Sequence, residues 1–451
     1  MTLHAHLCAR EAAGEPVRIG LIGAGKFGTM FLAQVRRTPG LHLVGLADLD
    51  LARARGRLAE AGWEAGAHAA PDFGEALKHR TTFLTESGDD LIACPEIDVI
   101  VEATGVPAAG IHHALGAIAH GKHIVMVNVE ADALAGPLLA EKARKAGVVY
   151  SLAWGDQPAL ICEHVDWARA CGFKVIAAGK GTRYEPHYHA SNPETVWAIL
   201  DKYLHIEDRG SINPKMFNSF IDGTKSAIEM TAVCNATGLF PQSGGLRFPP
   251  ASRFELAEVC KPASAGGALE TEGVTEVVSS VYRDGRDVPN HLAMGTFVVF
   301  EGESAYARRC FSEYHLMPDE SGRYAALYRP VHLIGLELGI SIASAALRGE
   351  PTGSPTGFRS DVVATAKRAL AAGEILDGEG GFCVWGRQTP APVSLARRLL
   401  PLGLAHGVRL KRAVAEGAAI GWDDVAYDAD ALAVRTRREM EEAFAPRLPP
   451  A

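Results

Sequence analysis

Long apolar runs, paired cysteines and basic blocks are all missing from this sequence of 451 residues. No segment approaches the ~18 uninterrupted apolar residues of a membrane-spanning helix. The eight cysteines form no C-x-x-C pair, which excludes a zinc ribbon or finger, and they are too sparse for a disulfide scaffold. Residues 1–16 lack the apolar core of a signal peptide. We therefore expect a cytoplasmic protein with reduced thiols.

Positive charge is also in short supply, with 45 Lys and Arg against 53 Asp and Glu and a net charge of −8. A chain of this charge without a basic cluster does not suit a phosphate backbone, so we expect no nucleic acid among its partners. Hydrophobic residues make up 47% and charged residues 22%, which is typical of globular proteins and excludes a disordered chain. At about 150 residues per domain, the length predicts about three domains.

A glycine-rich turn follows the first buried-looking run of the chain. Residues 17–22 predict a strand that ends in G-A-G-K-F-G, from Gly23 to Gly28. A helix-compatible segment and a second apolar run, residues 41–47, lead to Asp48, twenty residues after Gly28. This order of strand, G-x-G-x-x-G turn, helix, strand and acid is typical of the Rossmann dinucleotide-binding fold. A flavodoxin-like fold without a dinucleotide is the alternative.

Each part of the motif has a physical role. Gly23 permits the tight turn, Gly25 lets the backbone approach a pyrophosphate at the helix N-terminus, and Gly28 lets the helix pack on the strand. Asp48 would bind the ribose hydroxyls and repel a 2′-phosphate, which favours NAD over NADP, but Arg53 and Arg55 lie close enough in the sequence to undermine that inference. The expected cofactor-binding residues are Gly23, Gly25, Lys26, Phe27, Gly28, Asp48, Ala103, Thr104, Gly105 and Asn128.

The alternation of strands and helices continues beyond the first motif. Residues 97–105 predict a buried strand that ends in three small residues, a suitable place for the nicotinamide ribose. Residues 123–127 and 148–154 predict two further strands of the same sheet. Asn128 suits two roles, the N-cap of a helix with Glu130 in its first turn, or a position beside the nicotinamide.

The middle of the chain predicts a polar site. Asn213 as N-cap and Pro214 at the first helical position predict a helix that runs to about Thr237. Four of its polar residues recur at spacings of four, three and four, which predicts a common stripe. The stripe suits either a proton-transfer lysine between carboxylates or a solvated face with weak ion pairs. Its members are Asn218, Asp222, Lys225 and Glu229.

Two more segments complete the predicted middle domain. Residues 276–282 and 296–300 predict strands of an antiparallel sheet, which would cover the nucleotide domain and form the contacts of a homodimer. Residues 333–347 predict a long apolar helix that returns to pack on the first domain.

Several of these segments resemble known families. Residues 23–28, 98–105 and 121–128 resemble the nucleotide domain of homoserine dehydrogenases. Asp222 and Lys225 are similar in place to the substrate-binding Asp and the proton-transferring Lys of that family. Where the family has Asn-Lys after the G-K-H strand, this chain has Asn128 followed by valine, and this departure argues against homoserine as the substrate.

A resemblance that extends along most of the chain is to the 1-deoxy-D-xylulose 5-phosphate reductoisomerase-like proteins. It rests on residues 155–160, 178–182, 216–220, 222–226 and 332–338. The resemblance implies NADPH and a phosphorylated ketose that is rearranged and reduced, a step of isoprenoid precursor synthesis. The ordinary reductoisomerase holds a divalent metal with clustered carboxylates, and since that motif is not visible here, the metal stays open.

This resemblance also implies roles for individual residues. The implied catalytic residues are Lys225, Asp222, Lys180, Glu229 and Asp156. The implied substrate-binding residues are Gln157, Arg183, Lys215, Asn218 and Ser219.

The last hundred residues form a region of their own. Segments at 362–370, 372–381 and 416–425 resemble a SAF domain, the small β-rich module of sialic acid synthases and altronate dehydratases. This resemblance implies contact with a sugar acid or polyol, or a lid or dimer element. Residues 435–444 predict a charged helix on the solvated surface.

Together these features predict an α/β protein of three domains. An N-terminal tail (1–15) precedes a Rossmann domain (16–155), an α+β catalytic and dimerisation domain with an antiparallel sheet (156–350) and a β-rich SAF-like domain (351–451). The predicted function is that of an NAD(P)H-dependent oxidoreductase (EC 1.1.1), reductoisomerase-like and acting on 1-deoxy-D-xylulose 5-phosphate or a related sugar derivative. The alternatives are a homoserine-dehydrogenase-like dehydrogenase of a hydroxy acid or polyol, and a cofactor-binding sensor or carbohydrate-binding protein.

Overall fold

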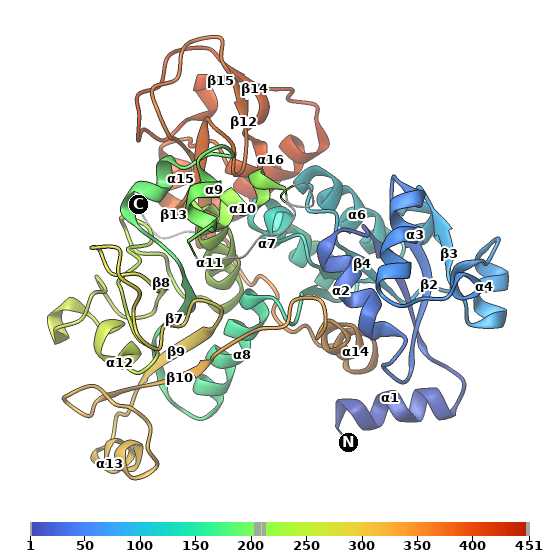
Figure 1. Cartoon of the computed structure of the whole chain (residues 1–451), viewed down its shortest axis with the longest axis horizontal. Helices are drawn as coiled ribbons and strands as arrows, with labels where there is room; N and C mark the ends of the chain where they lie inside the picture. The colour runs from blue at the N-terminus through green and yellow to red at the C-terminus, as the bar shows by residue number, and fades with distance from the viewer. Residues whose placement is uncertain (1, 203–208, 210–212, 448–451) are drawn as a thin grey trace. The chain divides into compact units, whose positions relative to one another are not determined.

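The structure, a computed structural model, describes residues 2–202, 209 and 213–447. The chain divides into two compact units (Figure 1), Met1–Leu160 with His332–Thr356, and Ile161–Val331 with Gly357–Ala451. The segment 332–356 therefore belongs with the nucleotide-binding region, whereas the SAF-like region shares a unit with residues 161–331. The expected N-terminal tail contains helix α1, Leu3–Ala12.

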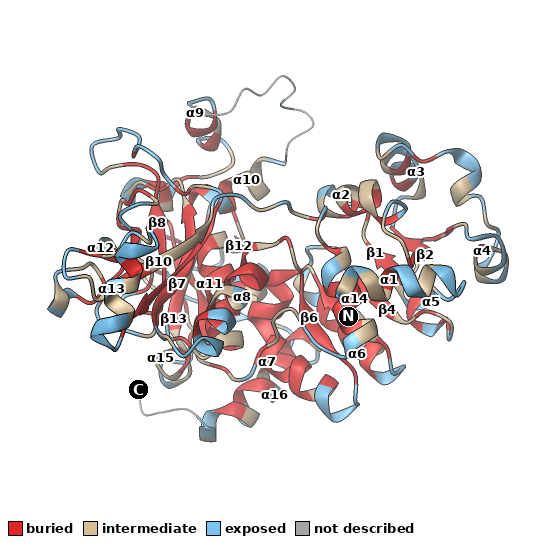
Figure 2. Ribbon diagram, turned by 90° about the horizontal axis from the view of Figure 1, so that it is seen from below, coloured by how far each residue is buried: buried red, intermediate tan, exposed pale blue. Residues whose placement is uncertain are grey.

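The first unit contains a parallel sheet. Its six strands follow the order β3-β2-β1-β4-β5-β6, as expected for a Rossmann domain. Their register is parallel throughout, and Figure 2 shows them buried, as parallel sheets with covered faces are. The strands are β1 Val17–Ile22, β2 Leu41–Ala47, β3 Phe83–Thr85, β4 Val99–Glu102, β5 His123–Met126 and β6 Tyr150–Leu152.

Helices surround this sheet, and one of them comes from far along the chain. Helix α14 (Gly339–Arg348) contributes Ile342 to the core that contains Ile19 of β1, which confirms the expected return of this segment. The helix begins six residues later than expected because Gly335, at φ +71°, packs tightly against α2. The other helices are α2 Lys26–Val35, α3 Leu51–Glu60, η1 Ala65–His68, α4 Phe73–His79, α5 Gly88–Ala93, α6 Pro107–Ala119 and α7 Val129–Lys145.

The second unit contains a four-stranded sheet of order β10-β9-β7-β8. β9 pairs antiparallel with both neighbours, whereas β8 runs parallel to β7, so the sheet is mixed rather than purely antiparallel. Its strands are β7 Lys174–Thr182, β8 Val274–Ser279, β9 Thr296–Glu301 and β10 Tyr324–Arg329. The helices along this part of the chain are α8 Gln157–Ala170, η2 Pro186–Ala190, α9 Val196–Leu200, α10 Pro214–Ile221, α11 Thr224–Thr237, α12 Leu256–Val259, η4 Ala263–Ala265 and α13 Ala305–Glu313.

The prediction of one helix from residue 214 to 237 is wrong, because α10 ends at Ile221 and α11 starts at Thr224. Gly223 adopts a left-handed φ of +87°, which an α-helix does not allow and which glycine tolerates best. The four-residue stripe is therefore divided between two helices. The solvated-face interpretation is also wrong, since Asn218 and Asp222 are fully buried and Glu229 is 5% exposed.

The SAF-like region packs against α11 within the same unit. Gly386 donates its backbone N–H to the Thr224 hydroxyl of α11 at 2.8 Å. The region consists of two small antiparallel sheets, β11-β13 and β12-β14-β15. Its elements are β11 Ser360–Ala366, β12 Ile375–Asp377, β13 Val384–Pro390, α15 Ala391–Ala396, η5 Leu402–Leu404, β14 His406–Leu410, η6 Trp422–Asp424, β15 Val425–Ala426, α16 Leu432–Phe444 and η7 Ala445–Arg447.

The prediction that the last helix is a solvated surface is wrong. Arg437 of α16 has no exposed side-chain surface, and its guanidinium binds Asp361 of β11 at 2.6 Å and Glu441 at 2.9 Å. A buried carboxylate needs such a partner, so Asp361 anchors the helix. All eight cysteines are free thiols, as expected. None of the described helices is long and apolar enough to span a membrane.

A buried carboxyl group in α7 should make the stability of the first unit depend on pH. Asp132 has no exposed surface and accepts the Tyr150 hydroxyl at 2.9 Å. Burial raises the pKa of Asp132 from 3.8 to about 7. Between these pH values the folded chain keeps a proton that the unfolded chain releases, so stability falls as the pH rises from about 4 to about 7.

Asp132→Asn removes this titration and keeps an acceptor for Tyr150. We expect the variant to gain stability relative to the wild type between pH 5 and 8, by up to roughly 4 kcal/mol. Urea unfolding at both pH values checks this, with the exposed Glu86→Gln as control. Parallel pH profiles of wild type and Asp132→Asn would contradict the burial argument.

Candidate active site

The glycine-rich turn has the geometry that a dinucleotide needs. Gly23 adopts φ +101°, and a Cβ there would lie 2.7 Å from the carbonyl oxygen of Ala103. Gly25 is the N-cap of α2 without a side-chain cap, and a Cβ on it would meet nothing within 4 Å. The first turn of α2, with Lys26 and Phe27, thus keeps N–H groups for an anion. The described residues therefore fit the pyrophosphate of a dinucleotide.

Asp48 has a different environment from the one expected for a ribose ligand. Its Oδ2 accepts the backbone N–H of Ala24 at 2.8 Å, and its Oδ1 accepts the backbone N–H of Asp50 at 3.0 Å and an N–H of the Arg53 guanidinium (Nη2) at 2.6 Å. The Asp48 side chain is 4% exposed, whereas that of Arg53 is 54% exposed. Asp48 therefore braces the glycine turn, and Arg53 neutralises its charge.

The small residues after β4 belong to a polar network. Asn128 caps α7 by accepting the N–H of Ala131 at 3.0 Å, which confirms the N-cap interpretation, and its amide donates to Thr104 Oγ1 at 3.3 Å. Thr104 donates its hydroxyl to Glu102 at 2.5 Å. Glu102 is fully buried, and its Oε2 has no hydrogen-bond partner among the described residues. Glu102 was not predicted as a site residue. The expected roles of Ala103, Thr104, Gly105 and Asn128 beside a cofactor stay predictions.

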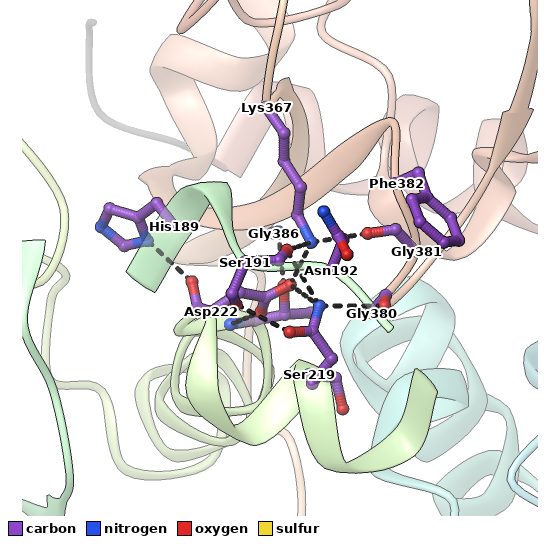
Figure 3. A network of polar contacts seen from close by, with 12 residues as sticks. His189, Ser191, Asn192, Ser219, Asp222, Lys367, Gly380, Gly381, Phe382 and Gly386 are labelled. Carbon is purple, nitrogen blue, oxygen red and sulfur yellow. Dashed lines mark hydrogen bonds and ion pairs between the residues drawn. The ribbon is translucent and has the colours of Figure 1, made fainter. Parts of the chain in front are cut away.

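In the second unit, the junction of α10 and α11 is held by a buried ion pair. Asp222 Oδ2 lies 2.8 Å from Nζ of Lys367, and the two side chains are 0% and 2% exposed. Asp222 Oδ1 accepts the N–H of Thr224 at 2.9 Å, which fixes the first turn of α11. Figure 3 shows Lys367 reaching down from the SAF-like region to Asp222.

Lys367 has all three of its donors occupied. Besides Asp222, its ammonium group contacts the carbonyl oxygens of Ser191 and Gly381, both at 2.7 Å. Asn218 of α10 completes the network, since its amide donates to the Ser191 carbonyl at 3.1 Å and to that of Gly380 at 3.0 Å. Asn218 and Asp222 are therefore brought together, but both carboxylate oxygens of Asp222 already have partners.

A histidine that the sequence did not single out joins this network. His189 Nδ1 lies 2.7 Å from the carbonyl oxygen of Asp222, so this nitrogen carries the proton. Its Nε2 then accepts the hydroxyl of Tyr184 at 2.9 Å, and its ring stacks on Trp385 at 3.8 Å. Burial lowers the pKa of His189. It is therefore a neutral link between α10 and the SAF-like region.

The other predicted site residues of this unit lie in separate contacts. Lys180 and Glu229 form a buried ion pair, with side-chain exposures of 5% and 6%. Arg183 binds Asp287 at 2.8 Å. Lys215 donates to the carbonyl oxygen of Asp377, and Ser219 donates its hydroxyl to Met216 of the same helix at 2.7 Å.

Lys225 is the more accessible of the predicted catalytic residues at the start of α11. Its side chain is 17% exposed, and its Nζ lies 3.8 Å from Oε1 of Glu379, a residue of the SAF-like region that was not predicted. Asp156 and Gln157 belong to the first unit, where Asp156 Oδ1 accepts the N–H of Gln157 at 2.8 Å. Within the described part of the chain, no group of three or more His, Cys, Asp or Glu side chains is arranged for a metal ion.

Sequence reasoning thus missed Lys367, Glu379, Ser191, His189 and Glu102. Lys367 directly follows the apolar residues of β11, and a lysine at the end of a buried strand is a weak signal for a buried cation. The remaining contacts join distant parts of the chain and have no local pattern.

Comparison with known families matches three segments of the chain. Residues 23–152 match the NAD binding domain of homoserine dehydrogenase, residues 155–338 match the catalytic domain named oxidoreductase DRL, and residues 361–426 match the SAF domain. The resemblances to a homoserine-dehydrogenase-type nucleotide domain and to a SAF domain are confirmed. A comparison with curated proteins finds no match.

The chain is also similar, at low identity, to solved structures of oxidoreductases. A homoserine dehydrogenase from Thiobacillus denitrificans is 16% identical over 73% of either chain, with a TM-score of 0.43. An NAD binding oxidoreductase from Klebsiella pneumoniae is 16% identical over 71% of this chain and 67% of its own, with a TM-score of 0.33.

The three family matches and the glycine-turn geometry identify the class of the protein. It is an NAD(P)-dependent oxidoreductase with a homoserine-dehydrogenase-like NAD-binding domain, an oxidoreductase catalytic domain and a SAF domain. A small-molecule substrate and a nicotinamide cofactor follow from this class.

Because Asp222 and Lys367 form a buried ion pair, replacing either one alone should strongly lower the free energy of unfolding. Lys367→Met leaves the Asp222 carboxylate buried without its cation, and we expect the second unit to lose about 3–5 kcal/mol of stability. The double variant Asp222→Asn/Lys367→Met removes both charges and should recover most of this loss. Urea unfolding of the wild type and the three variants checks the cycle, with Lys411→Met as an exposed control. Additive losses in the double variant would contradict the coupling.

Proposed function

We propose that the protein is an NADP(H)-dependent, reductoisomerase-like oxidoreductase that acts on 1-deoxy-D-xylulose 5-phosphate or a related sugar phosphate. The observation that carries the proposal is Lys225, which is held at the first turn of α11 within the segment that matches the catalytic domain. An acid-base group in this position suits a carbonyl substrate whose oxygen must take up a proton as it is reduced.

In the second unit, one group of residues would fix the position of Lys225, and Lys225 itself would act on the substrate. The Asp222–Lys367 pair and the Thr224 N–H fix the start of α11 and therefore the origin of the Lys225 side chain. The Lys225 ammonium would bind the carbonyl oxygen of the substrate and move a proton at that atom. When bound, the nicotinamide cofactor supplies the hydride.

The proposal is tested first by turnover. We expect the purified protein to oxidise NADPH with 1-deoxy-D-xylulose 5-phosphate and to form 2-C-methyl-D-erythritol 4-phosphate, assayed with and without Mg²⁺ or Mn²⁺. Lys225→Ala should lower kcat by at least ~100-fold and leave the Kd of NADPH nearly unchanged, because it removes a proton-transfer group. The exposed Lys411→Ala serves as control.

Other outcomes separate the alternatives. Turnover of a hydroxy acid or polyol without rearrangement would replace the reductoisomerase by a plain dehydrogenase. Cofactor binding without turnover on a panel of sugar phosphates, sugar acids and polyols would favour a sensor or carbohydrate-binding protein. Full activity of Lys225→Ala would remove Lys225 from the mechanism.

The environment of Asp48 supports NADP rather than NAD. Both Asp48 oxygens are occupied by groups of the chain itself, and Arg53 offsets the charge that would repel a 2′-phosphate. The half-exposed guanidinium of Arg53 is a suitable donor to that phosphate. We therefore propose NADP as the cofactor, in place of the NAD that Asp48 favoured in the sequence.

Arg53→Ala should weaken NADPH binding by about 10- to 100-fold, the usual contribution of a charge-assisted hydrogen bond, and change NADH binding little. Fluorescence titration with both cofactors measures this. Arg57→Ala, on the same helix and paired with Glu60, is the matched control. An equal loss for both cofactors, or tighter NADH binding by the wild type, would restore the preference for NAD. The homodimer, the cytoplasmic location and membership in EC 1.1.1 stay predictions.

A further inference from the structure

The loop between β12 and β13 of the SAF-like region is clamped onto the α10–α11 junction. Three carbonyl oxygens of this segment accept side-chain donors: that of Asp377 from Lys215, that of Gly380 from the buried Asn218, and that of Gly381 from the buried Lys367. Asp377 closes the loop on itself by accepting the N–H groups of Phe382, at 2.6 Å, and of Cys383. Figure 3 shows Gly381 joined to the Lys367 ammonium, with Gly380 and Phe382 on the same side of it.

Glycine makes this close approach possible. Gly380 has φ +65°, and a Cβ on it would overlap the Lys215 carbonyl oxygen and lie 3.2 Å from the Ser219 nitrogen. A side chain at this position would therefore push the loop off α10. The three carbonyl contacts and the close packing of Gly380 on α10 together fix the position of residue 379 relative to the start of α11.

Glu379 is the loop residue that faces the catalytic lysine. Its Oε1 lies 3.8 Å from Lys225 Nζ, and its side chain remains 27% exposed. Lysine ends a flexible stem of four carbons, so its ammonium group needs a fixed partner to hold one direction. In a partly buried setting the attraction between the two charges is stronger than in water.

We infer that this SAF-like loop is part of the substrate site and that Glu379 is the positioning residue of Lys225. The inference rests on the proposed function of Lys225. It gives the SAF-like region a part in catalysis on small hydroxylated carbonyl compounds: Glu379 orients the Lys225 ammonium toward the carbonyl oxygen of the substrate.

The kinetic test compares Glu379→Gln, Glu379→Asp and Glu416→Gln in the full chain. Glu416 is an exposed carboxylate of the same region, so its variant makes the same charge change away from the site. With NADPH and the substrate that the wild type turns over, we expect Glu379→Gln to lower kcat at least tenfold, with KM changed less than threefold and NADPH affinity unchanged. Glu379→Asp should recover part of the loss, and Glu416→Gln should match the wild type.

A Glu379→Gln variant with kcat within twofold of the wild type would overturn the inference.

A second measurement does not depend on turnover. Trinitrobenzenesulfonate reacts with the free amine of lysine, and an ammonium group that is paired with a carboxylate reacts slowly. We expect the labelling rate of Lys225, followed by peptide mass spectrometry, to rise at least threefold in Glu379→Gln and to stay unchanged in Glu416→Gln. An unchanged rate in Glu379→Gln would overturn the pairing. If the wild type turns over no substrate while the labelling differs as expected, the pairing stands and the proposed function fails.

Discussion

The buried ion pair of Asp222 and Lys367 is the interaction on which the polar site of the second unit depends. Removing two opposite charges from water is costly, and the cost is met only when every donor and acceptor finds a partner. Lys367 meets this requirement with three oxygens, and Asp222 meets it with the ammonium and the first N–H of α11. The geometry leaves little freedom, so the SAF-like region and the α10–α11 junction have one relative position.

The same ion pair affects the positions of Lys225 and Glu379, the residues for which we propose roles in catalysis. The clamp on the loop from Asp377 to Phe382 sets the distance between Glu379 and Lys225, while the Thr224 contacts set the direction of α11. In the first unit the corresponding constraint is steric, because a side chain at Gly23 would collide with the backbone of Ala103, directly after β4. Asp48 and Arg53 form an ion pair beside that turn.

The nucleotide-binding region was the most predictable part of the fold. Five of its six strands, the glycine turn and the return of the segment at α14 agree with the prediction, whereas the edge strand β3 was not predicted. The predicted helix from residue 214 to 237 was wrong because a single glycine at a left-handed φ outweighs a favourable helical pattern on both sides. The charged helix α16 was misjudged for a related reason, since the ion pair of Arg437 with Asp361 overrides the polarity of its sequence.

The sequence by itself determined the class of the protein, because strand periodicity, glycine spacing and family-specific segments are local signals that survive without a structure. It also pointed to Asp222 and Lys225 as residues of one site. Only the tertiary structure decided where these residues lie, since it placed Asp222 in a buried ion pair and left the Lys225 side chain partly exposed. It also brought Lys367 and Glu379 to them from the SAF-like region. The physical reason is that burial and ion pairing depend on which distant segments meet, and no local pattern contains that information.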